Sequence, residues 1–248
     1  MVSLQAITAG YVLTAAMAEG IITALEVQKR NKRRVNIYLD ETFAFSLALE
    51  EAALLRKGQA LSAEDVAALQ AADALARAVD SAARFLALRP RSTHEVRENL
   101  ARKAVAPAVV ELAIERLSAL GYLDDAAFAE FWVRERNQSK PLSPRALRYE
   151  LRQKGVADDL IEAALAQVDA QDAAYRAAAA QARRLRGSDR AAFRSKLYAH
   201  LARRGFDSET AKTTIRQLLE TLEHEDASFF AERQPDLPDE DDMRSEPS

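Results

Sequence analysis

The sequence contains an internal repeat of about fifty residues, and this repeat restricts the possible folds more than any other feature. Seven positions of one copy recur 51 residues later, which pairs Ser92 with Ser143, Val96 with Leu147, Leu100 with Leu151, Lys103 with Lys154, Val105 with Val156, Val110 with Ile161 and Ile114 with Leu165. A third copy, 50 residues further on, has its matching positions at Leu197, Leu201, Arg204, Gly205, Phe206, Ala211 and Ile215. Because each copy is one small module that buries its apolar face against its neighbours, we expect a tandem array.

Each copy is predicted to form a bundle of three helices. The seven glycines and seven prolines in 248 residues are few, and this favours helix because both residue types break helices. In the second copy Pro144 starts the second helix, and Gly155 follows its basic last residue as a left-handed cap. Gly205 has the same place in the third copy. The first copy has Ala104 there, which is less favourable than glycine in that conformation.

The segment before the repeats has a different pattern. β-Branched and aromatic residues over 22–27, 34–39 and 42–47 partly alternate with polar residues and are separated by polar turns. This pattern predicts a small antiparallel meander. A helix is expected over residues 49–56, and a longer one is expected to start after Ser62, a favourable N-cap residue.

These observations predict a mainly α fold, with tandem three-helix-bundle repeats in an elongated array, preceded by a small antiparallel β meander. Residues 1–20 contain no capping signal, no clear period and no basic start of a secretory signal, so a disordered extension is expected there. The expected domains are the meander with helices over 21–80, the repeats over 81–123, 124–168 and 169–222, and a disordered acidic tail over 223–248.

The charge of the chain is distributed unevenly. Residues 223–248 carry ten Asp or Glu against two Arg, a net charge of −8. Because the whole chain has a net charge of −3 and Glu19 is the only charged residue among the first twenty, residues 21–222 carry +6. A basic body with an acidic tail suggests a polyanionic partner for which the tail competes, although a tail that only aids solubility would have the same composition.

The sequence lacks the residues on which most catalytic and cofactor sites depend. It contains no cysteine, and its histidines (His94, His200 and His224) are dispersed without carboxylates at metal-ligand spacing. It also has no glycine-rich phosphate loop, no nucleophile elbow and no run of about eighteen apolar residues. We therefore expect a cytoplasmic protein that is not an enzyme, needs no metal or cofactor and does not contact membranes.

Basic residues at helical spacing are the remaining candidates for function. Arg145, Arg148 and Arg152 follow the i, i+3, i+7 spacing of one helix face, while Leu147 and Leu151 face inward. The other copies carry further basic residues, namely Arg97, Arg102 and Lys103 in the first and Arg190, Arg194, Lys196, Arg203 and Arg204 in the third. One such arginine usually only keeps a surface solvated, but a cationic face that recurs on stacked modules suits a long acidic partner.

Several strings within the repeats are distinctive. They are Gly121-Tyr122-Leu123-Asp124-Asp125, Phe128-Ala129, Trp132-Val133-Arg134 with Arg136, Pro144-Arg145 with Leu147 and Leu151, Lys154-Gly155-Val156, and Leu201-Ala202-Arg203-Arg204-Gly205-Phe206. Together they resemble the bacterial RecX regulatory proteins, and the resemblance covers residues 21 to 220. It implies a curved, elongated molecule that lies in the groove of the RecA filament on DNA. It further implies suppression of the ATPase, strand-exchange and coprotease activities of RecA in recombination and the SOS response.

The resemblance and the basic spacing together define candidate partner-binding residues. They are Arg134, Arg136, Arg145, Arg148, Arg152, Lys154, Arg194, Arg203 and Arg204. The expected partner is the RecA filament, with weak and nonspecific DNA contact in addition, and the expected state is a monomer. Two other classes stay open: a stand-alone DNA-binding protein, because a three-helix unit with a basic second helix also resembles a helix-turn-helix, and a scaffold for another protein.

Overall fold

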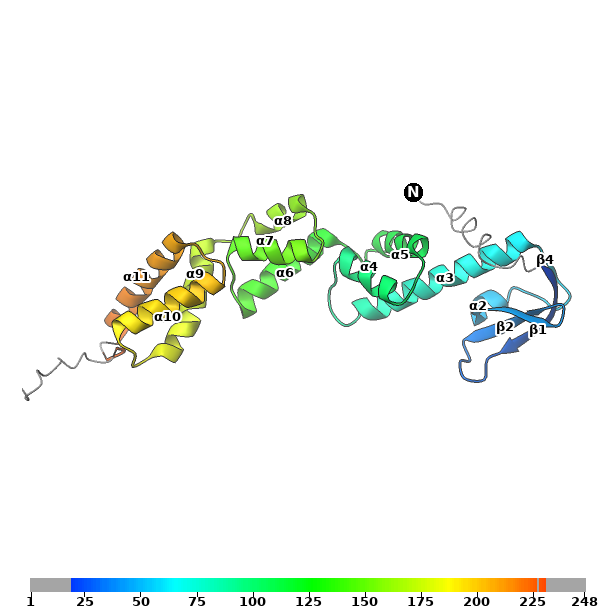
Figure 1. The fold of residues 1–248 in the computed structure, drawn as a ribbon, viewed down its shortest axis with the longest axis horizontal. Coiled ribbons are helices and arrows are strands. Elements are labelled where there is room, and N and C mark those ends of the chain that lie inside the picture. Colours follow the sequence, from blue (N-terminus) through cyan, green and yellow to red (C-terminus); the bar gives the residue numbers. More distant parts are fainter. Residues whose placement is uncertain (1–18, 227, 231–248) are drawn as a thin grey trace, which may run out of the picture. The chain divides into compact units, whose positions relative to one another are not determined.

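A computed structural model describes residues 19–226 and 228–230 (Figure 1). The expectations for residues 1–18 and 231–248 therefore lie outside the described residues. The described chain packs as two units, which are treated separately below. One unit contains residues 19–129 with 153–160, and the other contains residues 130–152 with 161–230.

An antiparallel sheet begins the first unit, as predicted. Its strands are β1 (Gly20–Val27), β2 (Arg34–Leu39), β3 (Thr42–Ala48) and the two-residue β4 (Ala60–Leu61), in the order β3-β2-β1-β4. Along β2, Val35, Ile37 and Leu39 are buried and alternate with partly exposed residues. The turn between β2 and β3 has positive φ at both Asp40 and Glu41, as expected for a two-residue hairpin.

Helix α2 (Leu49–Ala52) is shorter than the predicted helix over residues 49–56. The chain turns back to the sheet after Ala52, where the Gly58 N–H donates to the Ile22 carbonyl over 2.8 Å. The Ile22 N–H in turn donates to the Gln59 carbonyl over 2.9 Å. Gly58 therefore shapes the turn before β4 at a φ of +86°, rather than capping a helix.

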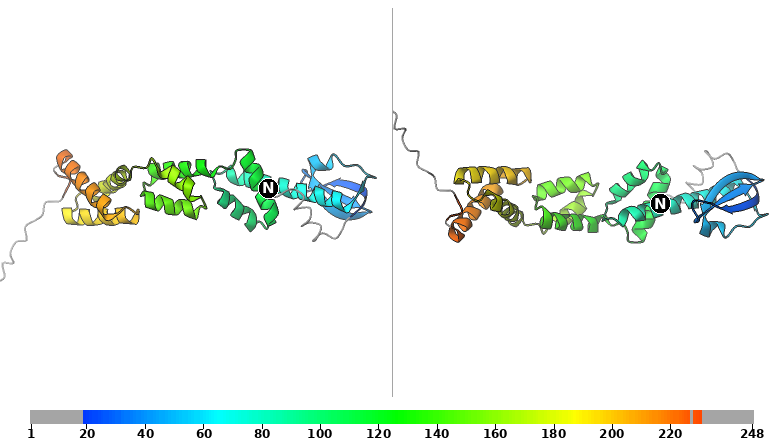
Figure 2. Two further views of the ribbon diagram at one scale, coloured as in Figure 1. Left: turned by 90° about the horizontal axis from the view of Figure 1, so that it is seen from above. Right: turned by 90° about the horizontal axis from the view of Figure 1, so that it is seen from below.

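Helix α3 (Ala63–Leu86) begins at the predicted Ser62 and runs from the sheet to the first repeat (Figure 2). A reciprocal capping box fixes its start, because Ser62 and Asp65 each accept from the other's backbone N–H. Val66 packs in the core of the sheet, whereas Ala78 packs in the core of the next two helices. One helix thus serves both cores.

The next two helices of this unit are α4 (Thr93–Arg102) and α5 (Pro107–Ala119). Val96 and Leu100 on α4 are fully buried, as their spacing predicts. The α4 helix starts with a capping box between Ser92 and Glu95. These helices complete the first three-helix bundle with the C-terminal half of α3.

The remaining helices also follow the predicted repeat. Their bounds are α6 (Asp125–Ser139), α7 (Pro144–Gln153), α8 (Asp158–Leu165), α9 (Ala170–Ala182), the 3-10 turn η1 (Arg183–Leu185), α10 (Arg190–Arg203) and α11 (Ser208–Glu225). The fold is therefore mainly α, with three-helix segments in tandem after a small antiparallel sheet.

Aromatic packing orders the start of the expected acidic tail. We predicted disorder over residues 223–248, but residues 223–225 end α11. Beyond α11, Phe229 is 5% exposed and its ring lies 5.8 Å from that of Phe193 on α10. The Phe230 ring lies 5.0 Å from Phe193. These two rings anchor the chain to the third bundle because they bury apolar area there.

Candidate partner-binding surface

The predicted cationic face of α7 is partly neutralised. Leu147 and Leu151 are fully buried and Arg145 is exposed, as expected. Arg148, however, forms a two-pronged ion pair with Glu162 on α8, with nitrogen-to-oxygen distances of 2.6 and 2.8 Å. Such a fork holds the guanidinium on its own module. Arg148 is therefore a weaker candidate for contact with a partner than Arg145.

The first repeat contains the equivalent ion pair. Arg97 on α4 donates to Glu111 on α5 over 2.7 and 2.9 Å, and each of these residues lies 51 positions before its counterpart, Arg148 or Glu162. Sequence analysis missed this pair, although the repeat alignment contains the signal. The pair fastens the second helix of a repeat to the third.

Two of the candidate residues, Lys154 and Arg204, take part in equivalent contacts with the start of an earlier helix. We call the first set the α4 junction, made by Ser92, His94 and Glu95 with Lys154 and Gly155. We call the second set the α7 junction, made by Pro141, Ser143 and Ala146 with Arg204 and Gly205. Both candidates therefore stabilise the fold.

The α4 junction is ionic. The Ser92 hydroxyl donates to the Lys154 carbonyl over 2.6 Å, and the Lys154 ammonium donates to Glu95 over 2.9 Å. Glu95 also accepts from Arg89 over 2.8 Å and from the Ser92 N–H. Burial of Glu95 disfavours its charge, but the hydrogen bonds from Arg89, Lys154 and Ser92 outweigh it and lower the pKa of Glu95 to about 2.

The α7 junction relies on backbone groups instead. The Ser143 N–H donates to the Arg204 carbonyl over 3.1 Å, and the Arg204 guanidinium donates to the Pro141 carbonyl over 2.9 Å. Among the described residues, no carboxylate lies within ion-pair distance of Arg204. Burial lowers the pKa of Arg204.

Close packing explains the glycines at both junctions. Gly155 and Gly205 have φ of +71° and +83°, as the predicted left-handed caps require. A Cβ on Gly155 would collide with His94, and one on Gly205 would lie 2.7 Å from the Ser143 hydroxyl. Ala104 holds the same conformation with a φ of +57°, and it lines an open pocket. The first repeat tolerates alanine there because the Ala104 side chain borders this open pocket.

On α6, Arg136 is also held inside its module. Its Nε and the indole N–H of Trp132 each donate over 2.8 Å to the same Glu150 oxygen. The Arg136 guanidinium also lies 4.5 Å from the centre of the Trp132 ring, a favourable cation–π distance. Arg134, two residues earlier, is exposed.

The nine candidates therefore fall into two groups. Four are half-buried and bound to groups of their own fold, and these are Arg136, Arg148, Lys154 and Arg204. Five are exposed, and these are Arg134, Arg145, Arg152, Arg194 and Arg203. The exposed group forms the better candidate surface, since exposed side chains are more accessible to a partner than half-buried ones.

A groove of about 590 Å³ lies between α10 and α11 and includes one of the exposed candidates. Its lining residues are Arg194, Ser195, Tyr198, Lys212, Ile215, Arg216 and Leu219. The sequence analysis did not identify this groove, because its candidate residues included none from the third helix of the repeat, to which Lys212 and Arg216 belong.

His200 lies near several arginines of the third bundle. Its Nε2 atom is buried and has no hydrogen-bond partner among the described residues. Burial lowers the pKa of His200, and the positive charges of Arg204, Arg203 and Arg184 lower it further. This environment favours the neutral imidazole.

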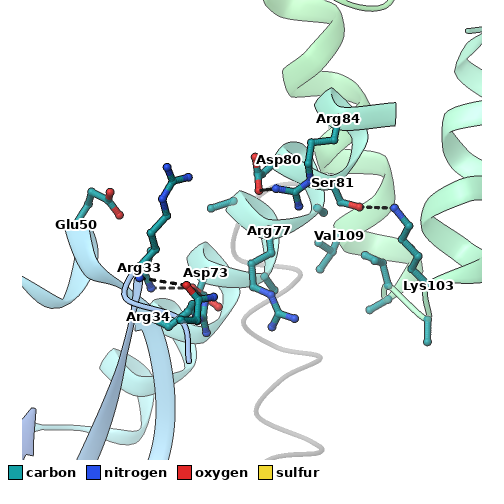
Figure 3. Close-up of a pocket in the computed structure, with 18 residues that line it drawn as sticks. Arg33, Arg34, Glu50, Asp73, Arg77, Asp80, Ser81, Arg84, Lys103 and Val109 are labelled. Atoms are coloured by element: carbon teal, nitrogen blue, oxygen red, sulfur yellow. Dashed lines mark hydrogen bonds and ion pairs between the residues drawn. The ribbon is translucent and has the colours of Figure 1, made fainter. Parts of the chain in front are cut away.

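A second pocket, of about 740 Å³, lies in the first unit between the sheet, α3 and the turn after α4 (Figure 3). Its lining contains five basic and three acidic residues, and two ion pairs form among them. The buried Asp73 accepts from Arg34 over 2.6 Å, and Arg84 pairs with Asp80. The pocket thus carries charges of both signs, with a small positive excess.

Other site classes gain no support from the described residues. Within residues 19–226 and 228–230, no group of three His, Asp or Glu side chains could hold a metal ion. No helix in the same ranges is both long and apolar enough to cross a membrane.

The fold defines a protein built of three-helix domains in tandem behind an N-terminal sheet domain, and models of known domains match it segment by segment. The matches are the N-terminal domain of regulatory protein RecX over residues 20–62, and the first, second and third three-helix domains of RecX over 78–117, 124–165 and 167–215. The chain belongs to the RecX family.

Individual relatives agree with this assignment. Regulatory protein RecX of Bacillus licheniformis is 32% identical over 201 residues, which are 79% of this chain and 76% of that protein. The RecX protein of Prosthecochloris aestuarii is 41% identical over 58% of this chain and 94% of its own length. That of Lactobacillus delbrueckii subsp. bulgaricus is 43% identical over 60% of this chain, and the match spans only 55% of that relative.

Two solved structures have the same fold. A crystal structure of regulatory protein RecX has a TM-score of 0.61 and 28% identity, and it covers 81% of this chain and all of that one. The crystal structure of RecX from Lactobacillus salivarius has a TM-score of 0.53 over 60% of this chain and 99% of that one. Its 22% identity supports the fold alone.

Proposed function

We propose that this protein is a non-enzymatic regulator that binds the RecA–DNA filament in the cytoplasm and inhibits its ATPase, strand-exchange and coprotease activities. Membership of the RecX family of regulatory proteins supports a regulatory role. The observation that carries the proposal is the set of basic side chains that the fold leaves exposed on the second helix of two successive repeats, with Arg145 on α7 and Arg194 and Arg203 on α10.

Inhibition would follow from binding several subunits at once. A tandem array offers basic residues at intervals along its length, which suits a polymer with a repeating acidic surface. A filament that is held at several points cannot readily make the subunit movements that accompany ATP hydrolysis. One regulator per several recombinase subunits would therefore be enough, and DNA phosphates would add only weak, salt-dependent contact.

The test is the rate of ATP hydrolysis by RecA on single-stranded DNA, with the regulator added below the RecA concentration. We expect a lower rate. The concentration of the variant Arg145→Glu/Arg194→Glu/Arg203→Glu that gives the same inhibition should be higher by about tenfold or more. The reason is that each change reverses the sign of an exposed charge. Helicity should change little, since Arg and Glu have similar helix propensities.

A matched control reverses three exposed basic residues in the turn between β1 and β2. This hairpin control, Lys29→Glu/Arg30→Glu/Lys32→Glu, changes the net charge equally but leaves the helical repeats intact. It should inhibit as well as the unaltered protein. Equal loss in both variants would show that only net charge matters, and an unchanged ATPase rate with equimolar, folded protein would refute the regulator proposal.

A stand-alone DNA-binding protein is the alternative function. The basic second helix of a three-helix unit, with Arg145 and Arg152 exposed on α7, supports it. This alternative predicts saturable binding to duplex DNA in the absence of recombinase at physiological salt. A filament regulator should bind such DNA weakly and lose that binding steeply as salt increases.

A further inference from the structure

The third repeat lacks the ion pair that closes the other two. Arg97 and Glu111 bridge the second and third helices of the first repeat, and Arg148 and Glu162 do so in the second. At the equivalent positions the third repeat has Tyr198 and Lys212, at offsets of 50 from the second repeat. Lys212 thus stands where the other repeats have the glutamate of the ion pair. Tyr198 and Lys212 both line the groove between α10 and α11.

The groove combines unbalanced positive charge with an apolar surface. Within the described chain, no carboxylate lies within ion-pair distance of Arg194, Lys212 or Arg216. All three are exposed. Ile215, which is buried, and the half-buried Leu219 supply the apolar lining between these charges. A segment that supplies several carboxylates and a few apolar side chains would complement this groove.

The chain contains such a segment close by. Residues 231–248 carry seven Asp or Glu against two Arg, with Leu237 and Met243 among the acidic residues. The described chain ends at Phe230, whose ring packs on Phe193, the residue before Arg194. Six further residues, as far as Asp236, can span about 20 Å, whereas Phe193 and Tyr198 are separated by only about 8 Å along the helix.

We propose that the acidic segment 231–248 docks into the α10–α11 groove of its own chain and covers Arg194, Lys212 and Arg216. The segment then replaces the carboxylate that Glu111 and Glu162 supply in the other repeats. Because the segment is tethered, its effective concentration is of the order of millimolar, so that even a weak individual contact is populated. An acidic partner would have to displace it, which makes the segment a competitive brake on this part of the surface.

Paramagnetic NMR on the full chain tests the proposal directly. The chain has no cysteine, so that Met243→Cys provides a single site for a nitroxide label. We expect loss of the amide signals of the residues that line the groove, and recovery of those signals after reduction of the label. Raising the salt concentration should also restore them, because the contact is between exposed charges.

Matched variants assign the contact. Arg194→Glu/Lys212→Glu/Arg216→Glu should restore the groove signals in the labelled protein, whereas the hairpin control should leave them lost. Neutralising the segment with Asp239→Asn/Glu240→Gln/Asp241→Asn/Asp242→Asn should have the same effect as reversing the groove. Full groove signals in the labelled, otherwise unaltered chain would overturn the proposal.

A mixture separates docking within one chain from docking between copies. Isotope-labelled protein without nitroxide is combined with unlabelled protein that carries the nitroxide. Signal loss in this mixture would identify a second copy as the occupant and would overturn docking within the chain. No recombinase is present in these experiments, so their outcome is independent of the proposed regulation of RecA.

Discussion

The α4 and α7 junctions place the same elements together by different chemistry. In each, the carbonyl of the basic residue at the end of one helix accepts a hydrogen bond from the serine that starts an earlier helix, and the following glycine packs against the first turn of that helix or its serine. The α4 junction adds the Lys154–Glu95 ion pair, whereas the α7 junction uses the Pro141 carbonyl to bind Arg204. The repeat therefore preserves the close approach of the backbones, while the charges around that approach differ between copies.

The two junctions separate basic residues that stabilise the fold from basic residues that are exposed to a partner. Lys154 and Arg204 look equivalent to Arg145 and Arg203 when only sequence spacing is considered. In the folded chain the first two are half-buried within junctions, and the last two are exposed. A basic residue directly before a cap glycine thus has a structural role in both junctions.

The largest expected effect comes from the junction glycines. Gly155→Ala or Gly205→Ala should destabilise the protein by about 3 to 5 kcal/mol, because backbone strain at positive φ adds to overpacking of the junction. Gly121→Ala is the matched control. Its φ is +74°, but an added Cβ would meet nothing within 4 Å, so that only about 1 to 2 kcal/mol of strain is expected.

Urea unfolding of the full chain provides these stabilities. If all three alanine variants lost the same stability, strain alone would account for the glycines, and close packing would not define the junctions.

The next largest effect is a difference between the two junctions in how their stability depends on pH. The pKa of Glu95 in the fold is about 2, against an ordinary value of 4.5, so its charged form stabilises the folded state. This stabilisation is present above pH 4.5 and is lost as the pH falls towards 2, with a total on the order of 3 kcal/mol. Protection from hydrogen exchange, taken relative to the intrinsic exchange rate at each pH, should therefore fall at the start of α4 in this range, with little change at the start of α7.

Glu95→Gln provides the control for this acid effect. At neutral pH it should weaken protection of α4 about as acid does, because the half-buried Lys154 and Arg89 lose their charged acceptor. It should also remove most of the remaining acid dependence at this junction. Acid sensitivity at α4 that persisted in this variant would assign the effect to another carboxylate.

The sequence predicted the regular parts of these junctions but not the charged ones. Ser92 and Ser143 as helix starts, and Gly155 and Gly205 as helix ends, follow from local capping rules. The Glu95–Lys154 pair spans 59 residues, and local rules contain no information on it. It depends on how one repeat packs on the next, which becomes visible only when the helices are placed.

The candidate surface divides in the same way. Exposure of Arg145 follows from helical spacing, since Leu147 and Leu151 fix which side is buried. The ion pair between Arg148 and Glu162 could have been inferred, because the first repeat has Arg97 and Glu111 at the equivalent positions. The cationic groove was missed because it depends on Lys212 replacing an acidic residue.

A smaller effect tests the cap of the first repeat, where Ala104 lines an open pocket. Ala104→Gly should stabilise the protein by about 0.5 to 1 kcal/mol, since glycine adopts positive φ without strain. The gain should be confined to this cap, because the same position is already glycine in the other repeats. A loss of stability in urea unfolding would mean that the Ala104 methyl group packs usefully in its pocket.

The smallest effect concerns the charge next to the α7 junction. Burial and the nearby arginines Arg204, Arg203 and Arg184 lower the pKa of His200, so the folded state binds this proton less well than the unfolded state. The contribution of His200 to stability is therefore complete above the unfolded pKa of about 6.5 and decreases as the pH falls below it.

Arg204→Gln should raise the pKa of His200 measured by NMR, because it removes one positive charge while keeping a donor for the Pro141 carbonyl. Lys196→Gln, on the same helix, removes a charge that does not act on His200 and should leave the pKa unchanged. Equal titration of His200 in all three proteins would show that burial alone sets its pKa, and that the cations at this junction do not act on the imidazole.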